Sequence, residues 1–163
     1  MKIVAGPASV ELAREVAGIS GWELVEVYHK LFPDGESYVR YPEEVAGEDL
    51  VIVQSCYPPQ DRHFLQLCLL VDAAQELGAR SVHVVVPYLA YARQDKRFLP
   101  GEAVSVRTIA KILCGLGIAS FATVDVHEEG LLSYFTAPAR DLTAMPLLAR
   151  KAAEYLGEWT FTL

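Results

Sequence analysis

Three short segments hold most of the side chains that could take part in chemistry. They are Phe32-Pro33-Asp34-Gly35-Glu36, the run at residues 91–97, and the run at residues 123–129. The first offers an aromatic ring between polar groups, the second a group of cations, and the third a carboxylate close to an imidazole. Together they supply a platform for a planar base, a clamp for phosphates and a contact for a metal ion. This combination is what a magnesium–nucleotide needs from its binding site.

The first segment has an ordinary structural explanation. Asp34 and Gly35 lie between two alternating runs and predict a hairpin turn, because both residue types tolerate positive φ. The turn does not explain the aromatic residue before it or the carboxylate after it. Phe32 could stack on a base, while Asp34 and Glu36 could accept hydrogen bonds from an exocyclic amine or a ribose hydroxyl. Both interpretations stay open on the sequence alone.

The second segment concentrates positive charge on an acidic chain. Arg93, Lys96 and Arg97 fall within five residues of a protein with 14 basic and 21 acidic residues and a net charge of −7. A run of charges is often a solvated loop. Here it follows a buried strand, and guanidinium and ammonium groups at such a position favour an anion site. Ser105 further along is expected to cap the next helix, whose dipole would also favour an anion.

The third segment places Asp125 and His127 two residues apart. If both lie in a strand, they point to the same face and could hold a divalent ion together. Magnesium prefers oxygen ligands, so His127 would be an unusual ligand and Asp125 a possible one. The alternative is a histidine that is hydrogen-bonded to its neighbours.

Composition excludes several classes of protein. Hydrophobic residues make up 52% of the chain and charged residues 21%, which is typical of a globular domain. The net negative charge argues against nucleic acid as a partner, and no apolar run approaches the ~20 residues that cross a bilayer.

The three cysteines have no metal-ligand spacing and indicate a reducing compartment, for which we expect the cytoplasm. Neither a Walker A sequence nor Gly-x-Gly-x-x-Gly is present.

The elements that must position these segments alternate between strand and helix. Strands are expected at residues 2–6, 23–31, 37–41, 50–54, 81–88, 119–126 and 159–163. Helices are expected at residues 9–17, 64–77, 104–116 and 144–156. This order predicts parallel βαβ crossovers and a doubly wound, mainly parallel α/β sheet, with residues 1–163 as one domain. Such sheets bind ligands at the carboxyl ends of their strands, where the second and third segments fall.

In this order and spacing, the segments resemble ribose-phosphate pyrophosphokinases, also called phosphoribosyl pyrophosphate synthetases. The matching stretches are Phe32-Pro33-Asp34-Gly35-Glu36, Arg93-Gln94-Asp95-Lys96 with Gly101-Glu102-Ala103-Val104-Ser105, Val124-Asp125-Val126-His127, and Asp141-Leu142-Thr143-Ala144. The short stretch at residues 93–105 is more similar to archaeal members than to bacterial ones. The resemblance covers nearly the whole chain and implies a type I phosphoribosyltransferase-like domain.

The resemblance also implies a reaction and roles for residues. The family transfers the β,γ-diphosphoryl group of ATP to ribose 5-phosphate in a magnesium-dependent reaction. By resemblance, Phe32 stacks on adenine, and Asp34 and Glu36 contact the base from a neighbouring subunit. The nucleotide site is then lined by Arg93, Gln94, Asp95 and Lys96. His127 contacts magnesium, and a homo-oligomer is expected.

The family repeats this domain, and the motifs of its second half do not occur here. We therefore expect the chain to be the amino-terminal half of such an enzyme, which binds nucleotide but holds no catalytic residue of its own and does not turn over. An isolated half should also expose apolar surface. The alternatives are a non-catalytic regulatory subunit that associates with a full-length synthetase, and a generic α/β nucleotide-binding module.

Overall fold

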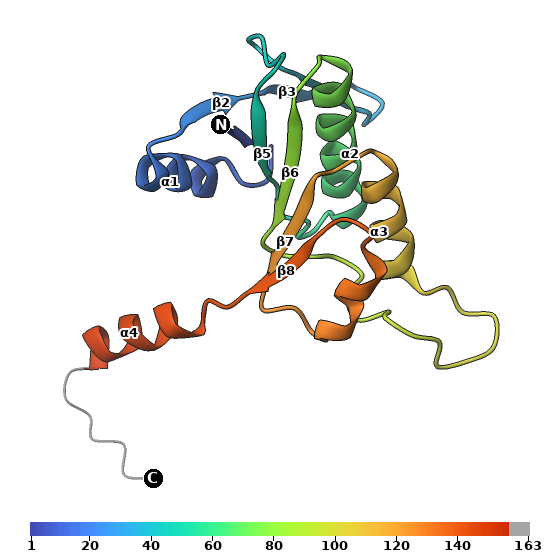
Figure 1. The fold of residues 1–163 in the computed structure, drawn as a ribbon. Coiled ribbons are helices and arrows are strands. Elements are labelled where there is room, and N and C mark those ends of the chain that lie inside the picture. The colour runs from blue at the N-terminus through green and yellow to red at the C-terminus, as the bar shows by residue number, and fades with distance from the viewer. Residues whose placement is uncertain (157–163) are drawn as a thin grey trace.

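A six-stranded, fully parallel sheet forms the centre of the computed structural model, which describes residues 1–156. The strand order is β2-β1-β5-β6-β7-β8 (Figure 1). The strands are β1 (Lys2–Ala5), β2 (Glu23–Glu26), β5 (Asp49–Val53), β6 (Ser81–Val86), β7 (Ser120–Val124) and β8 (Ala139–Leu142). Strand β2 lies on one side of β1, and β5, β6, β7 and β8 follow one another on the other side, which is a doubly wound topology.

Helices cover both faces of the sheet. The helical segments of residues 1–156 are α1 (Val10–Ser20), α2 (Gln60–Glu76), α3 (Ser105–Gly115), the short 3-10 helix η1 (Glu129–Tyr134) and α4 (Met145–Leu156). Figure 1 shows α1 on one side of the sheet and α2 with α3 on the other, while α4 extends away from the body. The predicted fold class is therefore confirmed.

Strand alternation explains how the larger core forms. In β6, Val82, Val84 and Val86 are buried and the residues between them are only partly covered. The buried set faces α2 and α3, where it meets Leu67 and Leu70 of α2. A smaller core lies under α1 and consists of Ile3, Ala5, Ala13, Ala17 and Val53. Helix α1 is short and lies over the side of the sheet that contains β1. The face of the sheet that α1 packs against is therefore only partly covered along β6, β7 and β8.

A separate antiparallel hairpin interrupts the parallel order. It consists of β3 (Tyr28–Leu31) and β4 (Ser37–Arg40), which pair with each other only. The single strand expected at residues 23–31 is wrong, because the chain leaves the sheet at the buried Val27. The hairpin is fastened to α2, since the Tyr41 hydroxyl donates to the Leu70 carbonyl at 2.9 Å and Gln66 Nε2 donates to Ser37 Oγ at 3.1 Å.

The last strand of the sheet, β8, is one that the sequence did not predict. Its residues, Ala-Arg-Asp-Leu, are half polar and follow a proline. Its pairing partner is β7, which only the folded sheet provides. The strand expected at residues 159–163 lies outside the described residues.

The three cysteines are buried or partly covered by the fold. Cys56 is buried, while Cys68 and Cys114 are partly covered, and all three are free thiols. Burial raises the pKa of Cys56 to about 12, with a further contribution from the nearby Cys68. None of the described helices is long and apolar enough to cross a membrane.

An ion pair joins the amino ends of β5 and β6 and should make stability depend on pH. Arg80 Nε donates to Asp49 Oδ1 at 2.8 Å, and Ser81 Oγ donates to the same oxygen at 2.6 Å. These hydrogen bonds, with that from Arg80 contributing most and that from Ser81 next, hold the pKa of Asp49 well below its ordinary value of 3.8. A carboxylate with a depressed pKa contributes stability above its ordinary pKa, and this stability is lost as the pH falls toward the depressed value.

We expect Asp49→Asn to lower the free energy of unfolding at neutral pH. The difference from the wild type should shrink once the pH falls below about 3.8, because the wild-type carboxylate then begins to take up its proton. Urea denaturation at neutral and acidic pH measures both free energies. Asp72→Asn is the matched control, because Asp72 is exposed on α2 and makes no ion pair with the described residues. A difference that is constant with pH would show that the charge of Asp49 is not involved.

Candidate functional site

A cavity of about 500 Å³ opens at the carboxyl ends of β6 and β7. One wall comes from the segment after β6 and the other from the end of β7 and the residues that follow. The lining residues are Pro87, Tyr88, Leu89, Tyr91, Ala92, Arg93, Gln94, Thr123, Val124, Asp125, Val126 and His127. The fold thus brings together the second and third segments of the sequence, at the edge where parallel sheets bind ligands.

The first wall is a loop with a fixed starting point. Tyr91 adopts a positive φ of 65°, a conformation that is uncommon for a residue with a side chain. Its hydroxyl donates to the Asp61 carboxylate in the first turn of α2. This hydrogen bond, together with some burial, raises the pKa of Tyr91. The Gln94 N–H then donates to the Tyr91 carbonyl at 3.1 Å, which closes a turn around Arg93.

Arg93 is exposed in this wall, and no carboxylate of residues 1–156 forms an ion pair with it. Its guanidinium is therefore available to an anion in the cavity. Asp95 and Lys96 follow in the same loop but do not line the cavity. The Asp95 carbonyl accepts a hydrogen bond from Tyr134, and Lys96 Nζ lies 5.6 Å from the centroid of the Phe98 ring.

The second wall differs from the geometry that we expected. Strand β7 ends at Val124, and Asp125 has a positive φ of 47°. Asp125 and His127 therefore do not share a strand face, and the reasoning from strand alternation was wrong. Both still line the cavity. Asp125 Oδ2 accepts the Ala144 N–H at 3.1 Å, which ties the wall to the start of α4.

The ligands for a metal ion are few. Among the described residues, no three His, Cys, Asp or Glu side chains form a group that could hold a metal ion. The cavity offers the imidazole of His127 and Asp125 Oδ1, which makes no hydrogen bond to a described residue. Magnesium commonly binds through one or two carboxylates and completes its shell with water and substrate phosphates. These residues fit a magnesium ion that is held mainly by the phosphates of a nucleotide.

The first segment forms the tip of the hairpin. The turn prediction is confirmed: Gly35 has a φ of 94°, its N–H donates to the Phe32 carbonyl at 2.8 Å, and Asp34 Oδ1 accepts the Glu36 N–H at 3.2 Å. No residue of this tip lines the cavity of the same chain. Phe32 is 38% exposed, and Lys30 Nζ lies 4.6 Å from the centroid of its ring. The structure therefore joins two of the three segments and leaves the third on an exposed projection.

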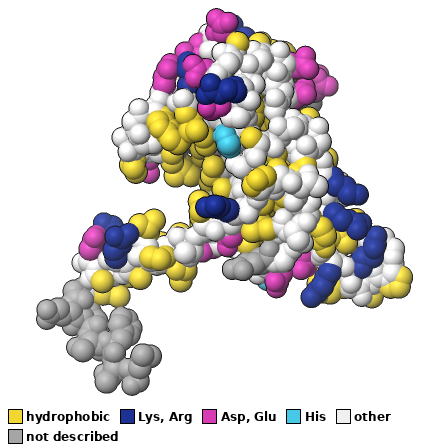
Figure 2. Space-filling model, in the orientation of Figure 1, with side chains coloured by type: hydrophobic (Ala, Val, Ile, Leu, Met, Phe, Trp, Pro, Cys, Tyr) yellow, Lys and Arg dark blue, Asp and Glu magenta, His cyan; other side chains and the backbone are white. Residues whose placement is uncertain are grey.

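Charge on the surface is uneven around the cavity. Figure 2 shows a group of cationic side chains over the protruding loop after β6 and over α3; acidic side chains gather mainly at the far end of the molecule, although some also lie beside this loop. The cations in this part of the chain are Arg93, Lys96, Arg97, Arg107 and Lys111. Ser105 is not the N-cap that we expected, because Val104 holds that position and Ser105 is the first residue of α3. The local positive charge would nonetheless attract a polyanion on a chain that is acidic overall.

Sequence reasoning singled out the segments of this site but missed the roles of some residues within and around them. Thr123 is fully buried beside the cavity, and its hydroxyl has no hydrogen-bond partner among the described residues. Tyr134 reaches the Asp95 carbonyl from η1, which no sequence pattern indicated. A strand pattern predicts which side chains point to each face of the sheet, but it does not predict which hydroxyl donates to which carbonyl.

Fold and cavity together define a phosphoribosyltransferase-like α/β domain with a cavity at the carboxyl edge of its sheet. Residues 1–117 match the family model described as the N-terminal domain of ribose phosphate pyrophosphokinase. The chain belongs to the ribose-phosphate pyrophosphokinase family, which confirms the family that the sequence motifs predicted.

Individual relatives agree with this assignment. The chain is 38% identical over 154 residues to the ribose-phosphate pyrophosphokinase of Sulfurisphaera tokodaii, which covers 94% of this chain and 53% of that protein. It is 42% identical over 147 residues to that of Methanothermobacter thermautotrophicus, which covers 90% of this chain and 51% of that protein. The crystal structure of phosphoribosylpyrophosphate synthetase from Mycobacterium smegmatis matches with a TM-score of 0.88 at 29% identity, over 94% of this chain and 52% of that one. The chain spans about half the length of the curated relatives it matches.

Proposed function

We propose that this chain is the nucleotide-binding half of a ribose-phosphate pyrophosphokinase. In the complete enzyme, the β,γ-diphosphoryl group of ATP would pass to ribose 5-phosphate, giving phosphoribosyl pyrophosphate and AMP. The observation that carries the proposal is that the exposed Arg93, unpaired among the described residues, lines the same cavity as Asp125 and His127 at the carboxyl edge of the sheet. This arrangement suits the polyphosphate of ATP better than a neutral ligand.

Each wall of the cavity has its own task in this proposal. Arg93 would donate to phosphate oxygens through its planar fork, and Gln94 would add a neutral hydrogen bond. Lys96 would add positive charge from the edge, and Asp95 would help to shape the loop. Asp125 and His127 would face a magnesium ion bound to the phosphates, and that ion would neutralise the phosphates' negative charge when bound. The protein would then act by positioning and by charge stabilisation, without a nucleophile of its own.

The base would be held by a second copy of the chain. Phe32, Asp34 and Glu36 lie on the hairpin tip, which does not reach the cavity of its own chain. We propose that the tip enters the site of a neighbouring subunit, where Phe32 stacks on adenine. The exposure of the Phe32 ring leaves it available for such a contact. A homo-oligomer is part of this proposal, because the base site is incomplete without it.

The acceptor sugar would depend on the second half of a complete enzyme. Helix α4 has no buried residue, and its exposed apolar side chains include Met145, Leu147, Leu148 and Tyr155. Figure 2 shows hydrophobic side chains around the hollow between α4 and the body. We propose that this surface packs against the second half, which would bring the site for ribose 5-phosphate. If the acceptor site belongs to that half, residues 1–163 by themselves should bind nucleotide without turnover.

Phosphorus NMR with Mg-ATP, recorded before and after ribose 5-phosphate is added, tests the proposal. ATP resonances should shift or broaden in the presence of the chain, and no AMP or phosphoribosyl pyrophosphate should appear. Spectra that do not respond to the protein would contradict nucleotide binding. New product resonances that depend on the protein would contradict the need for a second half. Co-purification with a full-length synthetase would favour the alternative, a regulatory subunit.

The free cysteines support a reducing compartment such as the cytoplasm.

A further inference from the structure

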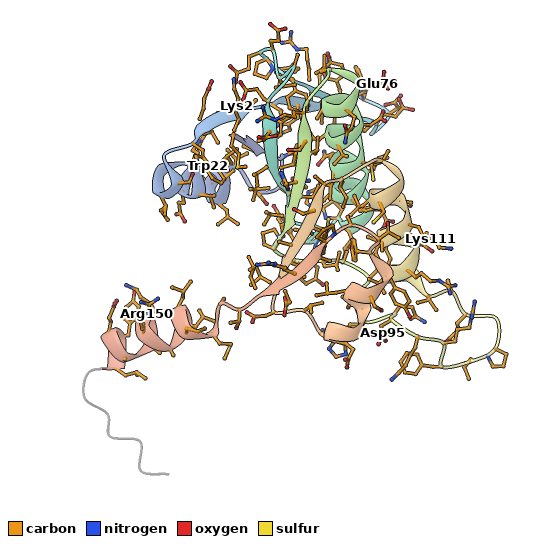
Figure 3. The ribbon with its side chains drawn as sticks, in the orientation of Figure 1. Lys2, Trp22, Glu76, Asp95, Lys111 and Arg150 are labelled. Atoms are coloured by element: carbon orange, nitrogen blue, oxygen red, sulfur yellow. The ribbon has the colours of Figure 1, made fainter. Side chains whose placement is uncertain are left out.

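Two tyrosine hydroxyls hold the loop that carries Arg93 and Gln94, one at each end. At its start, the hydroxyl of Tyr91 donates to the carboxylate of Asp61 on α2. At its far side, the hydroxyl of Tyr134 donates to the backbone carbonyl of Asp95 at 2.8 Å. Figure 3 shows Asp95 on the loop beside the 3-10 helix η1, which ends with Tyr134. The three residues between these two points that line the cavity are Ala92, Arg93 and Gln94.

The loop has hydrogen bonds of its own at its tip, where the Glu102 carboxylate accepts the N–H groups of Phe98 and Leu99, but these bonds lie away from Arg93 and Gln94. Residues 93–104 contain no helix or strand, and the side chains of residues 96–99 are exposed. Fixing a backbone residue costs conformational entropy, so this part of the loop would sample many positions for Arg93 if nothing held it. The hydrogen bond from the Tyr134 hydroxyl to the Asp95 carbonyl, which is half-buried, restricts part of this freedom.

Tyr134 is also joined to the opposite wall of the cavity. Helix η1 begins two residues after His127, so Tyr134 belongs to the segment that leaves the Asp125–His127 wall. The next residue, Phe135, is buried and stacks on Phe121 of β7 with ring centroids 4.1 Å apart. The hydroxyl of Tyr134 is therefore carried by a segment that is anchored in the core, and it reaches across to the carbonyl of Asp95.

We propose that Tyr134 is a positioning residue that sets the phosphate-binding loop against the Asp125–His127 wall, with Tyr91 as its counterpart at the other end of the loop. This inference rests on the proposed function. Tyr134 acts through the Asp95 backbone and does not itself contact the nucleotide. Its effect is the separation and orientation of Arg93 and Gln94 relative to the opposite wall.

Tyr134→Phe tests this role, because it removes the hydroxyl and keeps the ring. We expect binding of Mg-ATP, and of tripolyphosphate as a probe of the phosphate wall alone, to weaken about three- to tenfold, which corresponds to the loss of one hydrogen bond. Isothermal titration calorimetry gives the affinities, and amide resonances of Arg93 and Gln94 should shift in the free protein. Tyr91→Phe should weaken binding in the same direction, and its exposed position makes it safe for the fold.

Tyr41→Phe is the matched control. Its hydroxyl also donates to a backbone carbonyl, that of Leu70, at 2.9 Å, but it lies in the core between the hairpin and α2. This variant should lower the melting temperature and leave the affinity for tripolyphosphate unchanged, because that probe has no base to contact the hairpin. If Tyr134→Phe behaves like Tyr41→Phe, the hydroxyl is only structural and the positioning role is wrong.

The outcomes also separate this inference from the proposed function. A wild-type chain that binds neither Mg-ATP nor tripolyphosphate would overturn both. If the wild type binds and Arg93→Ala weakens binding while Tyr134→Phe and Tyr91→Phe bind as the wild type does, the proposed function stands and the positioning role is overturned.

Discussion

Replacing Arg93 by alanine is expected to weaken the binding of Mg-ATP about ten- to a hundredfold. A hydrogen bond between charged groups typically contributes about 1.5–3 kcal/mol, and each ~1.4 kcal/mol is a factor of ten in affinity. Arg93 lines the cavity, is exposed, and forms no ion pair with the part of the chain that the structure describes. Its charge is therefore not used elsewhere in the described fold, and its removal should affect the ligand more than the stability.

Calorimetric titration with Mg-ATP measures this loss, and Arg150→Ala is the matched control. Arg150 carries the same charge but lies on α4, away from the cavity (Figure 3). The control variant should bind as the wild type does. Equal losses in both variants would show that only net charge matters, and no loss at Arg93 would exclude the loop after β6 as the phosphate contact. The conservative variant Arg93→Lys should bind more tightly than Arg93→Ala but less tightly than the wild type, because it keeps the charge without the planar fork.

Replacing Phe121 by alanine is expected to lower the free energy of unfolding by about 3–5 kcal/mol, the usual cost of truncating a buried phenylalanine. Phe121 is 1% exposed and lies in β7, in the larger of the two cores. Its ring stacks on that of Phe135 at an interplanar angle of 17°. The alanine variant would leave a cavity between β7 and the segment after η1, because the surrounding structure relaxes only partly around a lost side chain.

Urea denaturation monitored by circular dichroism measures this change. Ile19→Ala is the control, because Ile19 is 89% exposed and should change the stability by less than about 0.5 kcal/mol. A loss at Phe121 below about 1 kcal/mol would mean that this stack contributes little to the core. The variant should also weaken nucleotide binding, since the stack anchors the segment between the Asp125–His127 wall and β8.

The amino-acid sequence by itself determined the class of fold and the family. The alternation of apolar strands with amphipathic helices is a local property of residues such as Val82, Val84 and Val86, and it predicted the parallel sheet before any contact was known. The turn at Asp34 and Gly35 was equally local, because it depends on the φ preferences of two residues. The motifs around Arg93 and His127 led to the family because residue types and spacing are properties of the chain alone.

Only the tertiary structure decided how the site is assembled. It showed that Arg93 and His127 line one cavity, that Asp125 leaves the strand with a positive φ, and that the hairpin tip with Phe32 stays outside. It also revealed β8, and the hydrogen bond from Tyr134 to the Asp95 carbonyl. These features depend on contacts between residues far apart in sequence, and their energies come from packing and pairing that no local pattern contains. Periodicity predicts which face of an element is buried, and the fold decides what that face meets.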